Sequence, residues 1–193
     1  VDFKQDHSPP SVPDFSVADG YLVDENFEDG LGEWSPYGGD DTRLHHDSTT
    51  SADGQHSVRI ESRKIGGRFG ARITRERFEA GKHRIVSFDY KADDRVRADF
   101  AVYVNGDLKG IRFLDNDSNI GVIGEVPDVV ADDRWRHAEF NLYEMLKRDD
   151  PEAETYQVRQ FLLGDWGQTG SRVGADYNID NFRIIPVVSG RDP

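Results

Sequence analysis

The sequence has no cysteine, no long apolar run and too few cationic residues to balance its acidic ones. Without cysteine the chain cannot form disulfides, use a thiol nucleophile or bind zinc through sulfur. No apolar run approaches the roughly 18 residues that a transmembrane helix needs. The sequence has 24 Lys and Arg residues and 37 Asp and Glu residues, which gives a net charge of −13. Proteins that bind nucleic acids or anionic membranes need clustered positive charge, so neither class fits.

What the chain does have is enough aromatic residues for a folded core. Its 193 residues suit one domain, and 11% of them are Phe, Trp or Tyr. Residues 1–20 hold three prolines, Pro9, Pro10 and Pro13, among Ser and Asp, which is typical of a linker. Residues 187–193 have a similar composition. We therefore expect a β-sandwich module over 21–186 with a linker on each side, excised from a longer protein that is secreted or on the cell surface.

Short alternating runs separated by Gly, Asn and Asp clusters indicate an antiparallel sandwich or barrel. Helix signals are scarce, and only 142–148 favours a helical turn or two, ended by Pro151. Asp53-Gly54 and Asn105-Gly106 are typical hairpin turns. The predicted strands are 21–27, 42–46, 56–62, 69–75, 83–91, 96–104, 109–114, 120–124, 135–142, 156–163 and 177–185.

Side-chain alternation assigns faces in three consecutive strands, 83–91, 96–104 and 109–114. The inward, apolar set is Val86, Phe88, Tyr90, Phe100, Val102, Val104, Ile111 and Phe113. The outward set is Asp89, Asp99, Tyr103 and Arg112. An aromatic ring among carboxylates and a guanidinium suits a sugar, because the ring stacks on the pyranose and the charged groups bind its hydroxyls. A solvated outer sheet face explains the same pattern equally well.

Four motifs, in their order along the chain, resemble the jelly-roll carbohydrate-binding modules of polysaccharide-degrading enzymes. They are Phe27–Trp34 (FEDGLGEW), Ser51–Ile60 (SADGQHSVRI), Trp135–Leu142 (WRHAEFNL) and Tyr177–Ile184 (YNIDNFRI). Each motif alone is weakly specific. The resemblance, which covers about residues 21–186, implies a galactose-binding-like jelly roll whose first and last strands pair.

The same resemblance implies a structural calcium ion that bridges the ends of those two strands. It assigns Glu28 and Asp180 as side-chain ligands and backbone carbonyls of the turn from Ser51 to His56 as further ligands. Calcium prefers such a mixture of carboxylate and carbonyl oxygens. The alternative is that both acids simply end strands in solvent.

A second acidic stretch, Asp115–Gly121, has oxygen-bearing side chains at alternate positions, as at the start of an EF-hand loop. Ile120 stands where the loop needs Gly and Val126 where it needs an acid, which excludes an EF-hand. Whether Asp115, Asp117 and Asn119 bind an ion stays open, with an ordinary polar turn as the alternative.

The tryptophans divide into two groups. Trp34 and Trp135 occupy positions that usually pack at the core edge in the resembled family. Trp166 lies in a Gly-rich loop after a predicted strand, and we expect its indole to stack on a sugar. Tyr37 is a second such candidate. The alternative for Trp166 is packing over the loop.

Catalytic motifs are missing from the sequence. It contains no Glu-x-Asp-x-x-Glu run, Gly-x-Ser-x-Gly elbow or His-Glu-x-x-His helix. We therefore expect a non-catalytic module that binds a polysaccharide or oligosaccharide. We also expect neighbouring domains in the same chain. The competing interpretation is a calcium-stabilised spacer or adhesion module without a sugar site. A laminin-G-like or concanavalin-like sandwich, suggested by Val102–Gly106 (VYVNG), fits less well because Trp135 follows that hairpin instead of preceding it.

Overall fold

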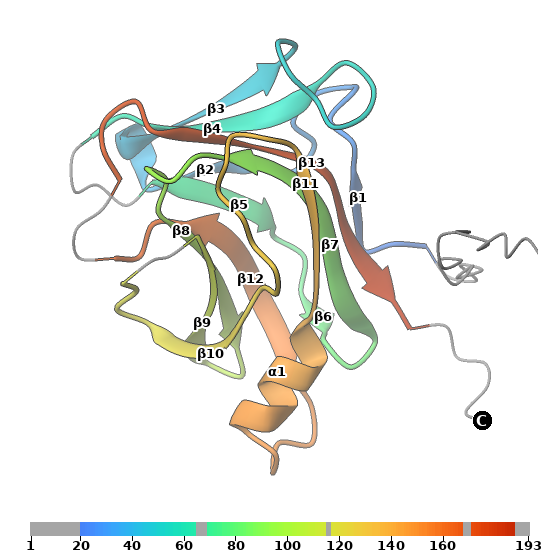
Figure 1. Ribbon diagram of the computed structural model, residues 1–193. Coiled ribbons are helices and arrows are strands. Elements are labelled where there is room, and N and C mark those ends of the chain that lie inside the picture. The colour runs from blue at the N-terminus through green and yellow to red at the C-terminus, as the bar shows by residue number, and fades with distance from the viewer. Residues whose placement is uncertain (1–19, 65–68, 115–116, 168–170, 188–193) are drawn as a thin grey trace, which may run out of the picture.

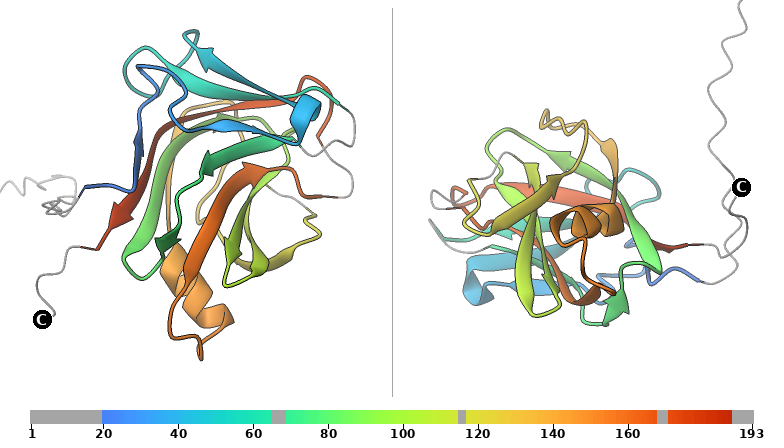
Figure 2. Two further views of the ribbon diagram at one scale, coloured as in Figure 1. Left: turned by 180° about the vertical axis from the view of Figure 1, so that it is seen from behind. Right: turned by 90° about the horizontal axis from the view of Figure 1, so that it is seen from below.

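Two β-sheets packed face to face, with one short helix at an open side, form the protein (Figure 1). This is a computed structural model, and it describes residues 20–64, 69–114, 117–167 and 171–187. Seen from behind and from below, the sheets are two separate curved layers (Figure 2). The predicted linkers lie almost entirely outside the described residues. The fold is the all-β antiparallel sandwich that the sequence predicts.

The first sheet has six strands in the order β11-β7-β13-β4-β3, with β1 paired to β13. Val23 lies opposite Ile184 in the antiparallel β1–β13 pair, so the first and last strands of the fold are neighbours, as the resemblance implies. The strands are β1 (Val23–Glu25), β3 (Thr42–Asp47), β4 (Ser57–Ser62), β7 (His83–Ala92), β11 (Arg136–Asn141) and β13 (Asp176–Pro186).

The second sheet has seven strands in the order β10-β9-β8-β12-β5-β2, with β6 paired to β12. The pair β10–β9 is parallel, whereas the other strand pairs of this sheet are antiparallel. The strands are β2 (Ser35–Tyr37), β5 (Gly70–Thr74), β6 (Phe78–Glu79), β8 (Ala98–Val104), β9 (Asp107–Leu114), β10 (Gly121–Glu125) and β12 (Gln157–Gly164).

Every strand predicted from the sequence is present, with ends shifted by a few residues. The predicted helical turns are the helix α1 (Leu142–Asp149), and a single 3-10 turn, η1 (Gly39–Asp41), precedes β3. The side chain of Asn141 accepts the backbone N–H of Glu144 and so caps α1 at its start. Sequence analysis missed β2 and β6, because strands of two or three residues are too short to show alternation.

The core between the sheets is aromatic. All eight side chains predicted to face inward are buried. Trp34 is also buried and packs edge-on between Phe27 and Phe182, at ring centroid distances of 5.3 and 5.2 Å. Its predicted structural role is confirmed. Such edge-to-face pairs stabilise the core beyond the area they bury.

The β8–β9 hairpin shows why Asn105-Gly106 predicts a turn. Asn105 has φ of 51° and Gly106 of 102°, both in the region that Asn and Gly adopt most easily. The side chain of Asn105 also donates to the carbonyl of Thr155 at 2.7 Å, which ties the turn to the start of β12. In the part of the chain that the structure describes, no helix has the length and apolarity to cross a membrane.

Candidate functional site

The outer face of the seven-stranded sheet carries the side chains that suit a sugar. Tyr103 on β8 and Arg112 on β9 point outward, as alternation predicts, and the Tyr103 side chain is 38% exposed. Tyr37 on β2 lies on the same face and is half-buried. These residues come from three strands of one sheet, so the rigid sheet fixes their spacing.

Trp166 is buried on this face, whereas the sequence predicts an open indole. Only 8% of it is exposed, and its ring packs on Ala101 and Leu162. Its Nε1 donates to the carbonyl of Asp99 at 3.1 Å, and the Tyr37 ring lies 5.1 Å away. Because Ala101 is small, the sheet has a hollow that the indole fills. The alternative interpretation, packing over the loop, describes the observed position.

Asp99 is fully buried, which corrects its predicted place on the exposed surface. One carboxylate oxygen accepts the backbone N–H of Phe113 at 2.7 Å, while Oδ2 has no hydrogen-bond partner among the described residues. Trp166 bonds to the carbonyl of the same residue and covers this end of β8. Burial raises the pKa of Asp99 to about 6.

Asp89 lies on the opposite side of the molecule, because β7 belongs to the six-stranded sheet and β8 to the seven-stranded one. The prediction that it shares a face with Tyr103 and Arg112 is therefore wrong. Its carboxylate accepts from Asn181 Nδ2 at 2.8 Å and pairs with His137 Nδ1 at 2.9 Å. Both oxygens already have partners within the protein.

Two polar residues of the sugar-suited face were missed by sequence analysis. Gln160 on β12 lies opposite Tyr103, and Arg72 on β5 lies opposite both Ser35 and Leu162. The Nε of Arg72 is buried without a hydrogen-bond partner in the described part of the chain. Alternation along β5 predicts that Arg72 points outward, because its neighbours Ala71 and Ile73 are apolar and are buried in the structure. We call Tyr37, Arg72, Tyr103, Arg112 and Gln160 the outer-face cluster.

The turn at residues 51–56 is held by the two acids predicted to bind calcium. Oε1 of Glu28 accepts the backbone N–H groups of Gln55 and His56 at 2.8 and 2.9 Å. Oδ2 of Asp180 accepts those of Ala52 and Asp53 at 2.9 and 3.3 Å. The N–H groups of Gln55 and His56 lower the pKa of Glu28, whereas burial raises that of Asp180.

This arrangement does not fit a calcium ion, because the turn presents N–H donors, not carbonyl oxygens, to both carboxylates. The hydroxyl of Ser51 donates to the carbonyl of Gly54 within the turn at 3.1 Å. The ring of His56 stacks on His46 at 4.3 Å and lies 3.5 Å from Glu28 Oε2. Across residues 20–64, 69–114, 117–167 and 171–187, no group of three or more His, Asp or Glu is placed to hold a metal. Calcium binding stays a prediction.

The second acidic stretch is only partly described, since Asp115 lies outside the described residues. The backbone N–H of Asn119 bonds to the carbonyl of Trp166 at 3.1 Å, and Ser118 pairs with Gly167. Burial raises the pKa of Asp165, and the charge of Asp117 raises it further. The stretch thus packs beside Trp166. Trp135, the remaining tryptophan, is half-buried and donates from Nε1 to Thr50 Oγ1 at 2.9 Å.

Comparison with known proteins identifies a relationship over most of the chain. The model of the CBM_4_9 family, described as a carbohydrate binding domain, matches residues 19–156. No curated protein matches the sequence.

Among solved structures, the chain resembles the CBM22-2 xylan-binding domain of Xyn10C from Paenibacillus barcinonensis, with a TM-score of 0.51 and 15% identity over 86% of this chain and 99% of that one. It also resembles the CBM22-1-GH10 modules of Clostridium thermocellum xylanase Xyn10B, complexed with xylohexaose, with a TM-score of 0.50 and 15% identity over 88% of this chain and 29% of that one. At this identity the likeness concerns the fold alone.

Proposed function

Because the chain belongs to the CBM_4_9 family of carbohydrate-binding domains, we propose that it binds a polysaccharide through the outer face of its seven-stranded sheet. The family consists of non-catalytic modules, in agreement with the expectation that the protein is not an enzyme. The observation that carries the proposal is the outer-face cluster, in which an exposed ring lies among polar side chains on one rigid sheet.

The chemistry of this cluster suits a neutral sugar chain. The Tyr103 ring offers an apolar platform to the C–H face of a pyranose. Gln160 lies directly beside it and can both donate to and accept from hydroxyls. Arg112, which makes no hydrogen bond or ion pair with a described residue, can donate two parallel hydrogen bonds. Trp166 is the floor on which Tyr37 packs.

For the ligand class we propose a β-linked plant polysaccharide such as xylan. Two proteins of similar fold support this choice, one described as a xylan-binding domain and one complexed with xylohexaose. The net charge of −13 disfavours sulfated or uronic chains. By the same reasoning we propose that the module belongs to a secreted, multidomain carbohydrate-active protein, since the second of these structures contains a GH10 module as well.

The direct test is binding of xylohexaose by isothermal titration calorimetry, with soluble xylan in affinity electrophoresis as a second measurement. Tyr103→Ala should weaken binding about tenfold or more, because a stacking ring is a typical hot spot. Its melting temperature should stay unchanged, since the ring is exposed. Tyr21→Ala is the matched control, because Tyr21 contacts Arg183 on the other sheet. Equal affinity of Tyr103→Ala and the wild type would contradict the proposed site.

The spacer or adhesion module is the second candidate, and the burial of Trp166 favours it. A spacer has no groups aimed at a ligand, so the outer-face cluster would tolerate substitution without any change in binding. Absence of retardation by xylan, cellulose derivatives, mannan and β-1,3-glucan alike would favour the spacer.

We also propose a structural calcium at the turn 51–56, on the resemblance alone. Binding there requires peptide groups of the turn to rotate, so that carbonyl oxygens replace the N–H groups now facing Glu28 and Asp180. A bound ion stabilises the folded state by mass action, so excess chelator should lower the melting temperature. Asp180→Asn should remove that dependence. Identical melting curves with calcium and with chelator would contradict the proposal.

A further inference from the structure

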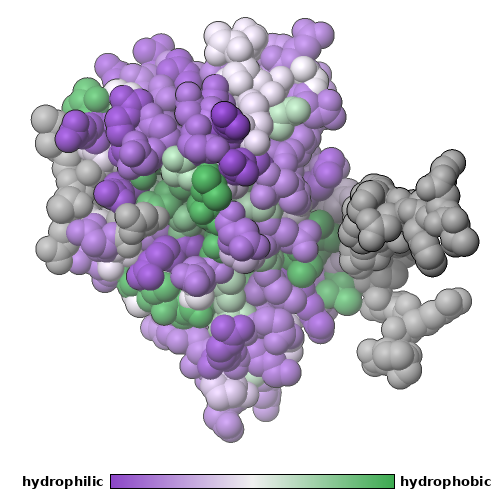
Figure 3. All heavy atoms as spheres, viewed as in Figure 1, coloured by the Kyte–Doolittle hydropathy of each residue, from purple (hydrophilic) through white to green (hydrophobic). Residues whose placement is uncertain are grey.

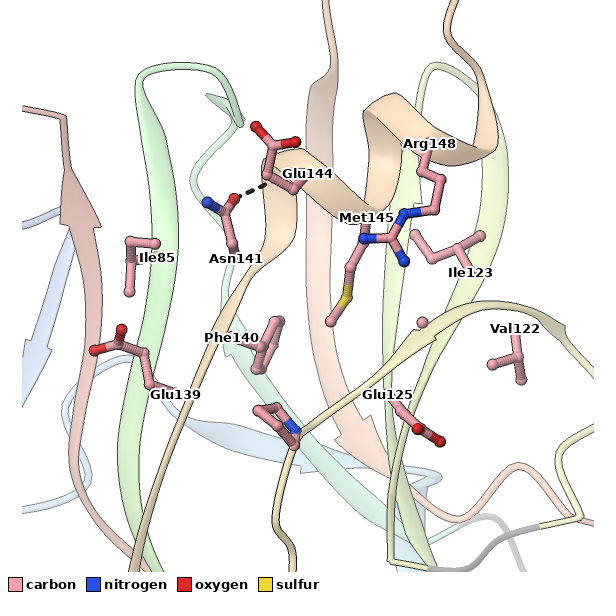
Figure 4. Close-up of a pocket in the computed structure, with 12 residues that line it drawn as sticks. Ile85, Val122, Ile123, Glu125, Glu139, Phe140, Asn141, Glu144, Met145 and Arg148 are labelled. Carbon is pink, nitrogen blue, oxygen red and sulfur yellow. Dashed lines mark hydrogen bonds between the residues drawn. The ribbon is translucent and has the colours of Figure 1, made fainter.

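A groove opens on the side of the sandwich where one edge of each sheet is free. It has a volume of about 820 Å³ and lies between β10, β11 and α1 (Figure 4). Strands β10 and β11 are the last strands of their sheets, so each has one unpaired backbone edge. None of the residues of the outer-face cluster lines the groove. Its size is within the range of roughly 300 to 1,000 Å³ typical of ligand sites.

The groove is built by close packing of β10 against α1. A Cβ atom on Gly124 would lie 2.7 Å from the sulfur of Met145, so glycine allows the strand to approach the helix. Asn141 caps α1 at the point where β11 ends, which fixes the angle between strand and helix. The groove is therefore a preformed feature of the fold.

Its floor is apolar and its rim is charged. Phe140 and Met145 are buried, and Ile123 and Val122 continue the apolar surface outward. Hydrophobic residues are visible around β10 within a hydrophilic surround (Figure 3). In Figure 4 Arg148 extends over this floor, whereas the side chain of Glu139 points away from it, across β11. Four charged residues belong to the lining of the groove. They are Glu125 of β10, Glu139 of β11, and Glu144 and Arg148 of α1.

These four charged side chains have no hydrogen bond or ion pair with any residue in the described part of the chain. Glu139 lies on the outer face of the six-stranded sheet, where other acids are paired, for example Asp176 with Arg59 at 3.1 Å. The rim thus holds two free acceptors, Glu125 and Glu144, and one free donor group, Arg148. Asn141 adds an amide NH₂ to the donors.

We propose that this groove is a second binding site for a neutral glycan chain, separate from the outer face of the seven-stranded sheet. A pyranose has C–H faces that pack on an apolar floor and hydroxyls that both donate and accept. The carboxylates of Glu125 and Glu144 disfavour an anionic glycan. The guanidinium of Arg148, which extends over the floor, disfavours a basic peptide, because it repels cationic side chains. The choice of a sugar over other neutral polyols rests on the proposed function.

The test is a ¹H–¹⁵N NMR titration of the protein with xylohexaose, cellohexaose and mannohexaose in turn. Two separate sets of backbone amides should shift with at least one of them. One set includes Tyr103 and Gln160 on the sheet face, and the other Val122, Ile123 and Met145 in the groove. If the first set alone did not shift, the proposed function would be contradicted. If the second set did not shift with any of the three sugars, this inference would be overturned.

Variants separate the two sites further. Arg148→Gln, at an exposed position without a partner among the described residues, should weaken binding in the groove about tenfold, the effect of one charge-assisted hydrogen bond. Binding on the sheet face should not change. Arg172→Gln, an equally exposed arginine outside the groove, is the matched control. Spermine or a lysine-rich peptide that shifts the groove amides more than every sugar would also overturn the inference.

Discussion

The two outer faces of the sandwich differ in how their polar groups are satisfied. On the six-stranded sheet, Asn178 donates to Asp47 and to Ser57, and Arg59 lies between Asp47 and Asp176. On the seven-stranded sheet, Arg112 has no such partner in the described chain, and the Nε of Arg72 is buried without one. Polar side chains of the first face thus bond to one another, whereas the second face has hydrogen-bond donors available for a ligand. Polar residues on the outer faces of two sheets can therefore serve stability in one sheet and recognition in the other.

Trp166→Ala should have the largest effect, and it tests whether this residue supports the recognition face or contacts the ligand. Removing a buried indole that packs on Ala101 and Leu162 should lower the free energy of unfolding by about 3 kcal/mol. Chemical denaturation measures this change. Trp166→Phe should recover much of the stability. Loss of sugar affinity in a Trp166→Ala protein of unchanged stability would instead make the indole a ligand platform, as the sequence predicts.

Asp99→Asn tests the buried acid beneath the recognition face. A carboxyl whose folded pKa of about 6 exceeds the unfolded value takes up protons on folding, so its ionisation destabilises the protein as pH rises from about 4 to 6. The amide removes this penalty while its oxygen still accepts from Phe113. We expect a gain of about 2 kcal/mol at pH 7.

The measurement is the difference in unfolding free energy between Asp99→Asn and the wild type across pH 3 to 8. Subtracting the curves cancels the contribution from Asp180, whose pKa burial also raises. The contribution from Asp165 cancels only in part, because its charge also raises the pKa of Asp99. The difference should be close to constant above pH 7 and should shrink below pH 5. A difference independent of pH would show that the Asp99 carboxyl ionises normally.

Sequence patterns predicted in which direction most side chains point but not which sheet carries them. Alternation placed Phe88 inside and Asp89 outside, and both assignments are correct. A sandwich has two outer faces, however, and the chain passes from one sheet to the other between β7 and β8. Alternation within a strand contains no information about that crossing, so Asp89 was grouped with Tyr103.

The burial of Trp166 and Asp99 was hidden for a different reason. The hollow that receives the indole depends on Ala101 of β8 and Leu162 of β12, which the antiparallel register places opposite each other. Register between strands far apart in sequence cannot be deduced from either strand alone. The groove beside α1 was missed likewise, because Gly124 and Met145 meet only in the folded chain.

The smallest effects on the free energy of unfolding are expected for two separate single substitutions, one on each outer face. Glu61 of β4 pairs with His45 at 2.6 Å, and this hydrogen bond is the main cause of its lowered pKa. A carboxylate with a lowered folded pKa stabilises the protein above its unfolded pKa, and the contribution is lost as pH falls through the folded value. Since the pair is partly exposed, Glu61→Gln should cost only about 0.5 kcal/mol at pH 7 and nothing near pH 3.

Arg112→Gln is the counterpart on the seven-stranded sheet. Its guanidinium makes no hydrogen bond or ion pair with a described residue, so the substitution should leave the unfolding free energy at pH 7 nearly unchanged, apart from a slight loss because its charge favours ionised Asp99. Binding of xylohexaose should weaken, because the donors aimed at the sugar are gone. Thermal melts and calorimetric titrations of both variants together decide the comparison. If Glu61→Gln weakened sugar binding and Arg112→Gln did not, the outer face of the six-stranded sheet would be the one that recognises the ligand.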